Sequence, residues 1–226
     1  MQYENIKRAV FLSRPNRFIA NIEIDGRPYL CHVKNTGRCR ELLLPGVDVV
    51  VQKAGSAARK TPYDLIGVWK GERFINIDAA APNQVVAEWL PASGLLAGIS
   101  HIRPETVYGD SRFDFYLESA EGPAFIEVKG VTLEENGVVR FPDAPTERGC
   151  KHLLGLIDCV KQGYAAFVIF VVQMENVRYF EANAATDPAF AAALAAAHRA
   201  GVRVLAYSCQ AGESSLFLHR PIPVKL

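Results

Sequence analysis

The sequence predicts a two-domain α+β protein, in which a small β-barrel over residues 1–80 precedes an α/β sandwich with a mixed sheet over residues 81–226. Short strand-like segments separated by turn residues fill the first eighty positions, whereas helical and strand-like segments alternate after them. The net charge also changes sign. Residues 1–80 hold thirteen Lys and Arg against eight Asp and Glu, and the remainder holds twelve against sixteen.

Five segments of the first domain have the pattern of short strands. Residues 17–24 alternate apolar and polar side chains, and Asp25-Gly26 then supplies the turn of a hairpin. The strands are expected at residues 17–24, 28–33, 47–51, 64–70 and 72–77. So many short strands favour a closed or partly open barrel, and the oligonucleotide/oligosaccharide-binding (OB) barrel is the natural candidate.

The second domain mixes helices with strands. Thr146 is suited to cap a helix, Asp187-Pro188 opens another, and a glycine follows each of the two. Helices are expected at residues 84–90, 146–162 and 187–201. Strands are expected at residues 102–108, 112–117, 124–130, 165–172, 177–181 and 202–207. This order predicts helices packed on a mixed sheet.

Nothing at the start of the sequence has the pattern of a secretory signal, and the longest apolar run, residues 164–172, is shorter than the roughly 20 residues of a membrane helix. The five cysteines form no Cys-x-x-Cys pair, so reduced thiols are expected rather than a structural zinc site. We therefore expect a cytoplasmic protein that does not bind membranes.

The most informative segment carries Asp114 and, after a turn, Glu127 and Lys129. Residues two apart on a strand face the same side, so Glu127 and Lys129 project together, and an antiparallel partner strand would bring Asp114 beside Glu127. Two carboxylates and an amine can hold Mg²⁺ or Mn²⁺ and orient a water. Glu88, on the preceding helix, is a further candidate ligand. The alternative is an ordinary solvated strand face.

Two basic segments are candidates for contact with phosphate. Lys34, Arg38 and Arg40 lie in a loop between strands of the first domain. In the second domain the first turns of the helix after Thr146 carry further cations, at a helix end that favours anions. These candidate residues are Arg148, Lys151 and His152. A capped helix with solvent-facing charges explains the same pattern.

Three aromatic residues of the first domain, Phe18, Tyr29 and Phe74, could stack on nucleobases if they face outward. The alternative, which such residues adopt more often, is a place in the barrel core.

The sequence resembles the sugar fermentation stimulation protein family (SfsA) along nearly its whole length. The matching blocks are Asn35-Thr36-Gly37, Tyr108-Gly109, Arg112-Phe113-Asp114-Phe115, Glu127-Val128-Lys129, Val131-Thr132-Leu133, Phe141-Pro142-Asp143-Ala144, Thr146-Glu147-Arg148-Gly149, Lys151-His152-Leu153 and Ala206-Tyr207. The resemblance implies an OB-like first domain and a second domain of the PD-(D/E)XK nuclease type. Asp114, Glu127 and Lys129 would then occupy the signature positions, and Glu88 that of the helix acid found in some related nucleases.

The leading hypothesis is therefore a hydrolase, a DNA-binding protein with a Mg²⁺- or Mn²⁺-dependent nuclease site. One alternative is a non-catalytic DNA-binding regulator linked to sugar utilisation, and another is a carbohydrate-binding module built on the barrel. The sequence has no helix-turn-helix pattern, which argues against an ordinary operator-reading repressor.

Overall fold

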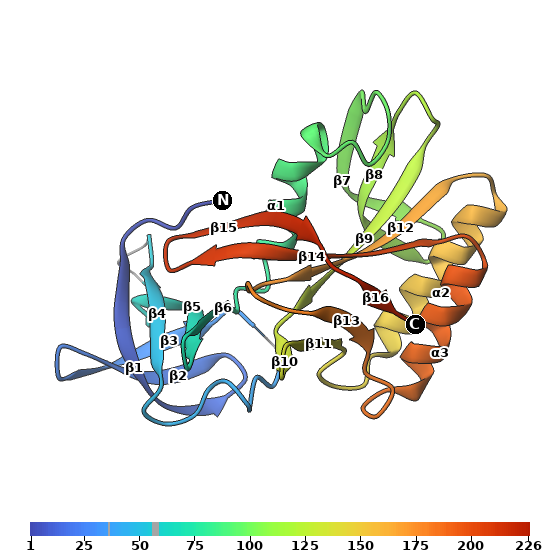
Figure 1. The fold of residues 1–226 in the computed structure, drawn as a ribbon. Helices are drawn as coiled ribbons and strands as arrows, with labels where there is room; N and C mark the ends of the chain where they lie inside the picture. Colours follow the sequence, from blue (N-terminus) through green and yellow to red (C-terminus); the bar gives the residue numbers. More distant parts are fainter. Residues whose placement is uncertain (36, 56–58) are drawn as a thin grey trace.

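The computed structural model describes residues 1–35, 37–55 and 59–226 (Figure 1). Residues 6–76 form a barrel beside a layered domain built from the rest of the chain (Figure 1). No helix in these described ranges is long and apolar enough to cross a membrane. All five cysteines are free thiols.

The barrel confirms the predicted OB architecture. Its strands are β1 (Ile6–Asn16), β2 (Ile19–Ile24), β3 (Arg27–Val33), β4 (Asp48–Lys53), β5 (Tyr63–Lys70) and β6 (Arg73–Asn76). They follow the order β3-β2-β1-β4-β5-β6, and a parallel pairing of β3 with β5 closes the first five into a barrel. Strand β1 was not predicted. Its cations and Pro15 obscure the alternation of the few side chains that it buries.

The second domain is a mixed six-stranded sheet in the order β15-β14-β12-β9-β8-β7. Its strands are β7 (His101–Tyr108), β8 (Ser111–Glu118), β9 (Ala124–Val131), β12 (Ala165–Val172), β14 (Arg203–Gly212) and β15 (Ser215–Pro221). Strands β9, β12 and β14 run parallel in the centre, and β7, β8 and β15 run antiparallel to their neighbours. The predicted mixed sheet is therefore confirmed, with β15 as an additional strand.

Helices cover both faces of this sheet (Figure 1). They are α1 (Ala81–Trp89), followed by a short 3₁₀ turn (Leu90–Ala92), α2 (Glu147–Lys161) and α3 (Pro188–Arg199). Thr146 accepts a hydrogen bond from the Gly149 amide at 3.0 Å, and Asp187 caps α3 in the same way, so both predicted N-termini are confirmed. Because α1 and α2 pack on opposite faces, strand β9 is buried on both sides.

A second, four-stranded sheet lies between the barrel and the helices. Its strands, in the order β10-β11-β13-β16, are β10 (Leu133–Glu135), β11 (Val138–Phe141), β13 (Tyr179–Ala182) and β16 (Val224–Lys225). Only β13 was predicted from the sequence. The others are two to four residues long, too short for a period-two pattern to stand out.

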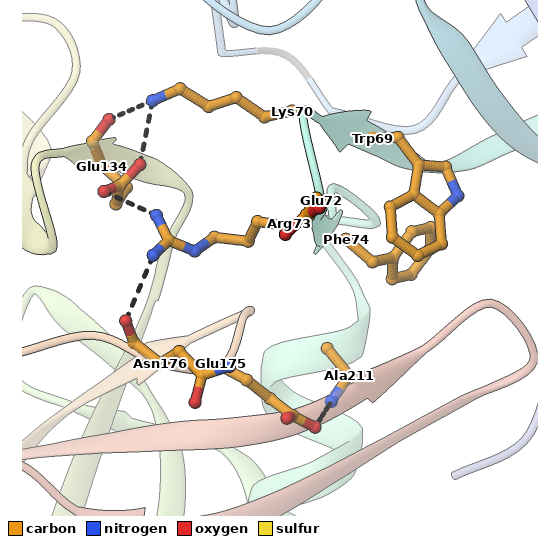
Figure 2. A pocket seen from close by; sticks show the side chains of 9 residues that line it. All are labelled: Trp69, Lys70, Glu72, Arg73, Phe74, Glu134, Glu175, Asn176 and Ala211. Carbon is orange, nitrogen blue, oxygen red and sulfur yellow. Dashed lines mark hydrogen bonds and ion pairs between the residues drawn. The ribbon is translucent and has the colours of Figure 1, made fainter.

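Glu134 of β10 joins the two domains electrostatically, as Figure 2 shows. Its carboxylate forms ion pairs with Lys70 Nζ at 2.9 Å and with Arg73 at 2.6 Å. It also accepts a hydrogen bond from the Gly137 amide at 2.6 Å. Arg73 donates in addition to the backbone carbonyl of Asn176 at 3.1 Å. This cluster lines a pocket of about 500 Å³ at the domain boundary. Two cations of the barrel thus hold one buried acid of the second domain, and we call these two ion pairs the clamp.

Burial alone would raise the pKa of Glu134, but Lys70, the Gly137 amide and Arg73 together lower it to about 2. A carboxyl group whose pKa is lowered in the folded protein stabilises the fold at pH values above its pKa in the unfolded chain, 4.5. This stabilisation is lost as the pH falls toward 2. The clamp should therefore weaken between these two pH values.

We predict that Glu134→Gln lowers the free energy of unfolding by about 2–3 kcal/mol at pH 7, because two cations lose their common partner. The difference from the wild type should shrink below pH 4.5. Urea denaturation over this pH range measures both effects. Glu135→Gln is the control, since its exposed side chain should contribute less than about 0.5 kcal/mol. A difference that persists unchanged at low pH would contradict the clamp.

Candidate functional site

Asp114 lies in the middle of β8, level with Glu127 of the neighbouring strand. The register pairs Phe115 with Ile126, and its next step brings Asp114 opposite Glu127, as predicted from the sequence. The Asp114 carboxylate accepts hydrogen bonds from the Val128 amide and from Asn83 Nδ2, both at 2.7 Å. Burial and the adjacent charge of Glu127 raise the pKa of Asp114. The backbone and α1 thus hold one carboxylate beside another.

Glu127 is a buried acid on the central strand β9, with a residue exposure of 2%. Burial alone would raise its pKa, but a hydrogen bond from His152 and the charge of Lys129 hold the pKa of Glu127 below its usual value. Both partners bond the same oxygen, Oε1. The other oxygen, Oε2, is buried and has no hydrogen-bond partner among the described residues. One carboxylate oxygen is therefore left unsatisfied in the site.

His152 orients Glu127 from helix α2. Arg148 Nε donates to His152 Nε2 at 3.4 Å, so the ring proton belongs on Nδ1, which donates to Glu127. The ring also lies edge-on to Phe113 and is 5% exposed. The prediction that His152 contacts DNA is therefore wrong, because the residue is buried inside the domain. Its place on the buried stripe with Leu153 and Leu156 could have indicated this.

On α1 it is Asn83, and not the predicted Glu88, that contacts the acid on β8. Asn83, to which no role was assigned from the sequence, donates a hydrogen bond to Asp114. Glu88 instead bonds the amino group of Met1 at 2.6 Å and Gln84 at 3.1 Å. No cluster of three or more His, Cys, Asp or Glu side chains suited to a metal ion occurs in the described ranges. The structure therefore brings Asp114 and Glu127 together without Glu88.

The basic loop of the barrel is organised by Arg14. Its guanidinium donates to the backbone carbonyls of Arg17, Asn35, Gly37 and Arg38 at 2.7–2.9 Å. These bonds hold a loop from which the side chains of Arg38 and Arg40 are exposed. Together with Arg17 they line a groove of about 460 Å³ that has no acidic residue in its lining.

The remaining candidate residues divide between surface and interior. Arg148 and Lys151 are exposed on the first turns of α2. Lys34 is instead engaged by Asp78, a nearly buried acid at the end of the barrel. It therefore contributes less free charge than the sequence suggested.

Among the aromatic candidates, Phe18 is 44% exposed, with the Arg17 guanidinium 4.7 Å from its ring centre. Tyr29 packs edge-on against Tyr63, and Phe74 is buried against Trp69. Only Phe18 therefore offers an exposed ring of the kind that base stacking requires.

Two family models match the chain. The model described as the SfsA N-terminal OB domain matches residues 12–77, and the one described as the sugar fermentation stimulation protein RE domain matches residues 80–215. A sugar fermentation stimulation protein homolog of Ruminiclostridium cellulolyticum is 51% identical over 226 residues, covering all of both chains. One of Desulfitobacterium hafniense strain Y51 is 54% identical, covering all of this chain and 99% of its own.

Among solved structures, Pyrococcus furiosus SfsA in complex with Ca²⁺ superposes with a TM-score of 0.89 at 28% sequence identity. The match covers all of this chain and 98% of that one. The similarity therefore extends across both domains.

We predict that His152→Leu lowers the free energy of unfolding by about 1–3 kcal/mol, because the change leaves a buried carboxylate with one partner fewer at similar side-chain volume. Chemical denaturation at pH 7 measures this loss. Arg148→Ala is the control, since the side chain is exposed on the same helix and its contact with the ring is long. Equal stability of His152→Leu and the wild type would show that the imidazole contributes nothing to holding Glu127.

Proposed function

We propose that this chain, which belongs to the sugar fermentation stimulation protein family, is a DNA-binding hydrolase that cleaves phosphodiester bonds at a metal site made by Asp114 and Glu127. One observation carries the proposal, namely the buried Glu127 Oε2, which lacks a partner among the described residues and lies on the strand next to Asp114. A buried unsatisfied carboxylate oxygen is costly unless a ligand completes it. The Asp and Glu-x-Lys arrangement is also that of the PD-(D/E)XK nucleases.

The donor set fits a hard divalent cation such as Mg²⁺ or Mn²⁺, which prefers carboxylate and carbonyl oxygens. Asp114, Glu127 and the Val128 carbonyl would hold it, and the bound cation would supply Lewis-acid polarisation of a phosphate. The relative from Pyrococcus furiosus was solved with Ca²⁺, which supports a hard cation as the ligand. Glu88 takes no part in the proposal, because its carboxylate is bonded to the amino group of Met1.

The protein's own groups then have separate tasks. Lys129 carries the ammonium that orients the attacking water and offsets the negative charge developing on the phosphate. His152 keeps the Glu127 carboxylate in one orientation, and Asn83 does the same for Asp114. These neighbours act on the ligands, so they are positioning residues.

Binding of the DNA backbone is assigned mainly to the barrel. Arg38, Arg40 and Arg17 line the acid-free groove, and exposed cations of this kind bind phosphate with a strong dependence on salt. Arg148 and Lys151, exposed on α2, are the candidate contacts of the second domain.

The same groove favours the alternative function. A non-catalytic DNA-binding regulator would need the arginines but not a working carboxylate pair. Cleavage therefore separates the two proposals.

We predict that the protein cleaves DNA in the presence of Mg²⁺ or Mn²⁺ and that Lys129→Ala reduces the rate by a factor of about 100 or more. Assays on single-stranded, duplex and supercoiled DNA measure this. Lys161→Ala, an exposed lysine at the end of α2, is the control and should cleave at the wild-type rate.

Calorimetry with the same metals is the companion measurement. The wild type should bind the cation, and Asp114→Asn should not. If the wild type binds no metal at millimolar concentration, the nuclease proposal falls.

For the groove, we predict that Arg38→Ala combined with Arg40→Ala weakens DNA binding and lowers the slope of log affinity against log salt by about 2, near one per phosphate contact. Fluorescence anisotropy at several salt concentrations measures this. Arg199→Ala with Arg220→Ala removes equal charge elsewhere on the surface and should leave the slope unchanged. An unchanged slope in the first variant would assign the contact to Arg148 and Lys151 instead.

A further inference from the structure

Several sequence blocks that the carboxylate site does not use converge on one pocket of about 310 Å³ between the domains. The barrel contributes Asn35 and Gly37 to it. The second domain contributes residues 130–133 at the end of β9 and the segment 140–146 before α2. The pocket's polar side chains are Asn35, Thr132, Arg140, Asp143, Thr146 and Gln173. Of the block Asn35-Thr36-Gly37, residue Thr36 lies outside the described residues.

This pocket adjoins the carboxylate site through two lining residues. Gly130 directly follows Lys129 on β9, and Pro82 directly precedes Asn83, which bonds Asp114. A side chain at position 130 could not be accommodated, because its Cβ would lie 2.6 Å from Gln173 Oε1 and 2.8 Å from Pro82 Cγ. The glycine therefore lets the strand pass closely between the pocket and the site.

The pocket also adjoins the arginine groove. Gly37 lines both, and the backbone amide of Arg38 donates to Asp143 of the second domain at 3.1 Å. This contact fixes the basic loop against the wall of the pocket. The carboxylate site, the pocket and the arginine groove thus form a continuous series across the domain boundary.

The size and chemistry of the pocket suit one nucleotide. A volume near 310 Å³ lies at the lower end of the range for small-molecule sites, about 300–1,000 Å³, and a duplex cannot enter it. Amide, hydroxyl and carboxylate groups together offer both the donors and the acceptors that the edge of a base requires. The Asp143 carboxylate disfavours a phosphate within the pocket, while the neighbouring arginines favour one outside it.

We propose that this interdomain pocket receives one unpaired nucleotide of the DNA substrate, so that the protein selects single-stranded DNA. The inference rests on the proposed function and specifies its substrate. The base enters the pocket, the backbone on one side follows the arginine groove, and the phosphate on the other side meets the carboxylates. Paired bases cannot occupy the pocket, because they remain within the stack.

The test fills the pocket with Thr132→Trp and compares it with Thr106→Trp on the β7 hairpin, a threonine of similar partial exposure. Both changes are made in full-length protein that also carries Lys129→Ala, so that binding is measured without turnover. The probe is a 12-nucleotide single strand with 2-aminopurine at its centre, used alone and as a duplex in Mg²⁺. We expect 2-aminopurine fluorescence to rise when the single strand binds, since the base leaves its neighbours.

Thr132→Trp should weaken single-strand binding at least about tenfold and abolish the rise in fluorescence, whereas Thr106→Trp should do neither. Duplex binding should be equal in the two variants. Circular dichroism verifies folding, and Ala144→Phe, which enters the same pocket, replaces Thr132→Trp if that variant does not fold.

The outcomes separate the two proposals. Unchanged single-strand binding in the pocket variants would overturn the pocket inference. Equal cleavage of duplex and single-stranded DNA by the wild type would overturn it as well. Neither result would contradict the nuclease proposal. If the wild type cleaves no DNA but the pocket variants lose single-strand binding, the nuclease proposal fails and the pocket inference holds.

Discussion

A buried negative charge at the centre of the sheet is the constraint on which the second domain depends. Glu127 lies on a strand covered from both faces, where an uncompensated carboxylate costs several kcal/mol. Compensation comes from Lys129 on the same strand and from His152 on α2. Helix α2 therefore cannot shift or rotate on the sheet without removing His152 from Glu127 and leaving the buried charge less compensated. Asp114 adds a second acid beside the first, and the charge of Glu127 helps to raise the pKa of Asp114.

The sequence predicted the parts of this site that depend on strand geometry. Side-chain alternation on β9 and antiparallel pairing with β8 were sufficient to bring Asp114 beside Glu127. The roles of His152 and Asn83 depend on where helices pack, which local pattern does not determine. A polar residue at a helix start is as consistent with capping or solvent contact as with a bond to a distant strand. For the same reason Glu88, one turn further along α1, was assigned to the wrong neighbour.

The fold shows the same division. Long strands with clear alternation and helices with capping residues were predicted, whereas β1, β10, β11, β15 and β16 were not. In β1 the charges of Lys7 and Arg8 interrupt the pattern, because the strand is largely exposed on one side. The small sheet has strands of two to four residues. Except for β13, these strands result from tertiary contacts that a local sequence window cannot detect.

The charge of the barrel illustrates how structure changes an argument made from composition. The excess of cations in residues 1–80 suggested a surface for polyanions, yet several of those cations are used internally. Lys34 is engaged by Asp78, Lys70 and Arg73 by Glu134, and Arg14 by backbone carbonyls. Three of the remaining exposed cations, Arg17, Arg38 and Arg40, line the groove that Arg14 organises. The internal ion pairs therefore reduce the positive charge that the barrel presents on its surface.

The positive charge of the groove matters for the proposed function, because a pair of carboxylates repels the phosphate on which it is proposed to act. A cation between Asp114 and Glu127 reverses the local sign only at close range, since salt screens charges beyond about 8–10 Å. A nucleic acid must therefore be held by positive charge placed elsewhere before its phosphate can approach the site. In the proposed function the groove on the barrel supplies that charge, and the contact of Arg38 with Asp143 holds the groove against the second domain. On this reasoning the proposed function requires positive charge on the barrel to lie close to the acids of the second domain, and the contacts across the domain boundary, such as that of Arg38 with Asp143, keep the two near each other.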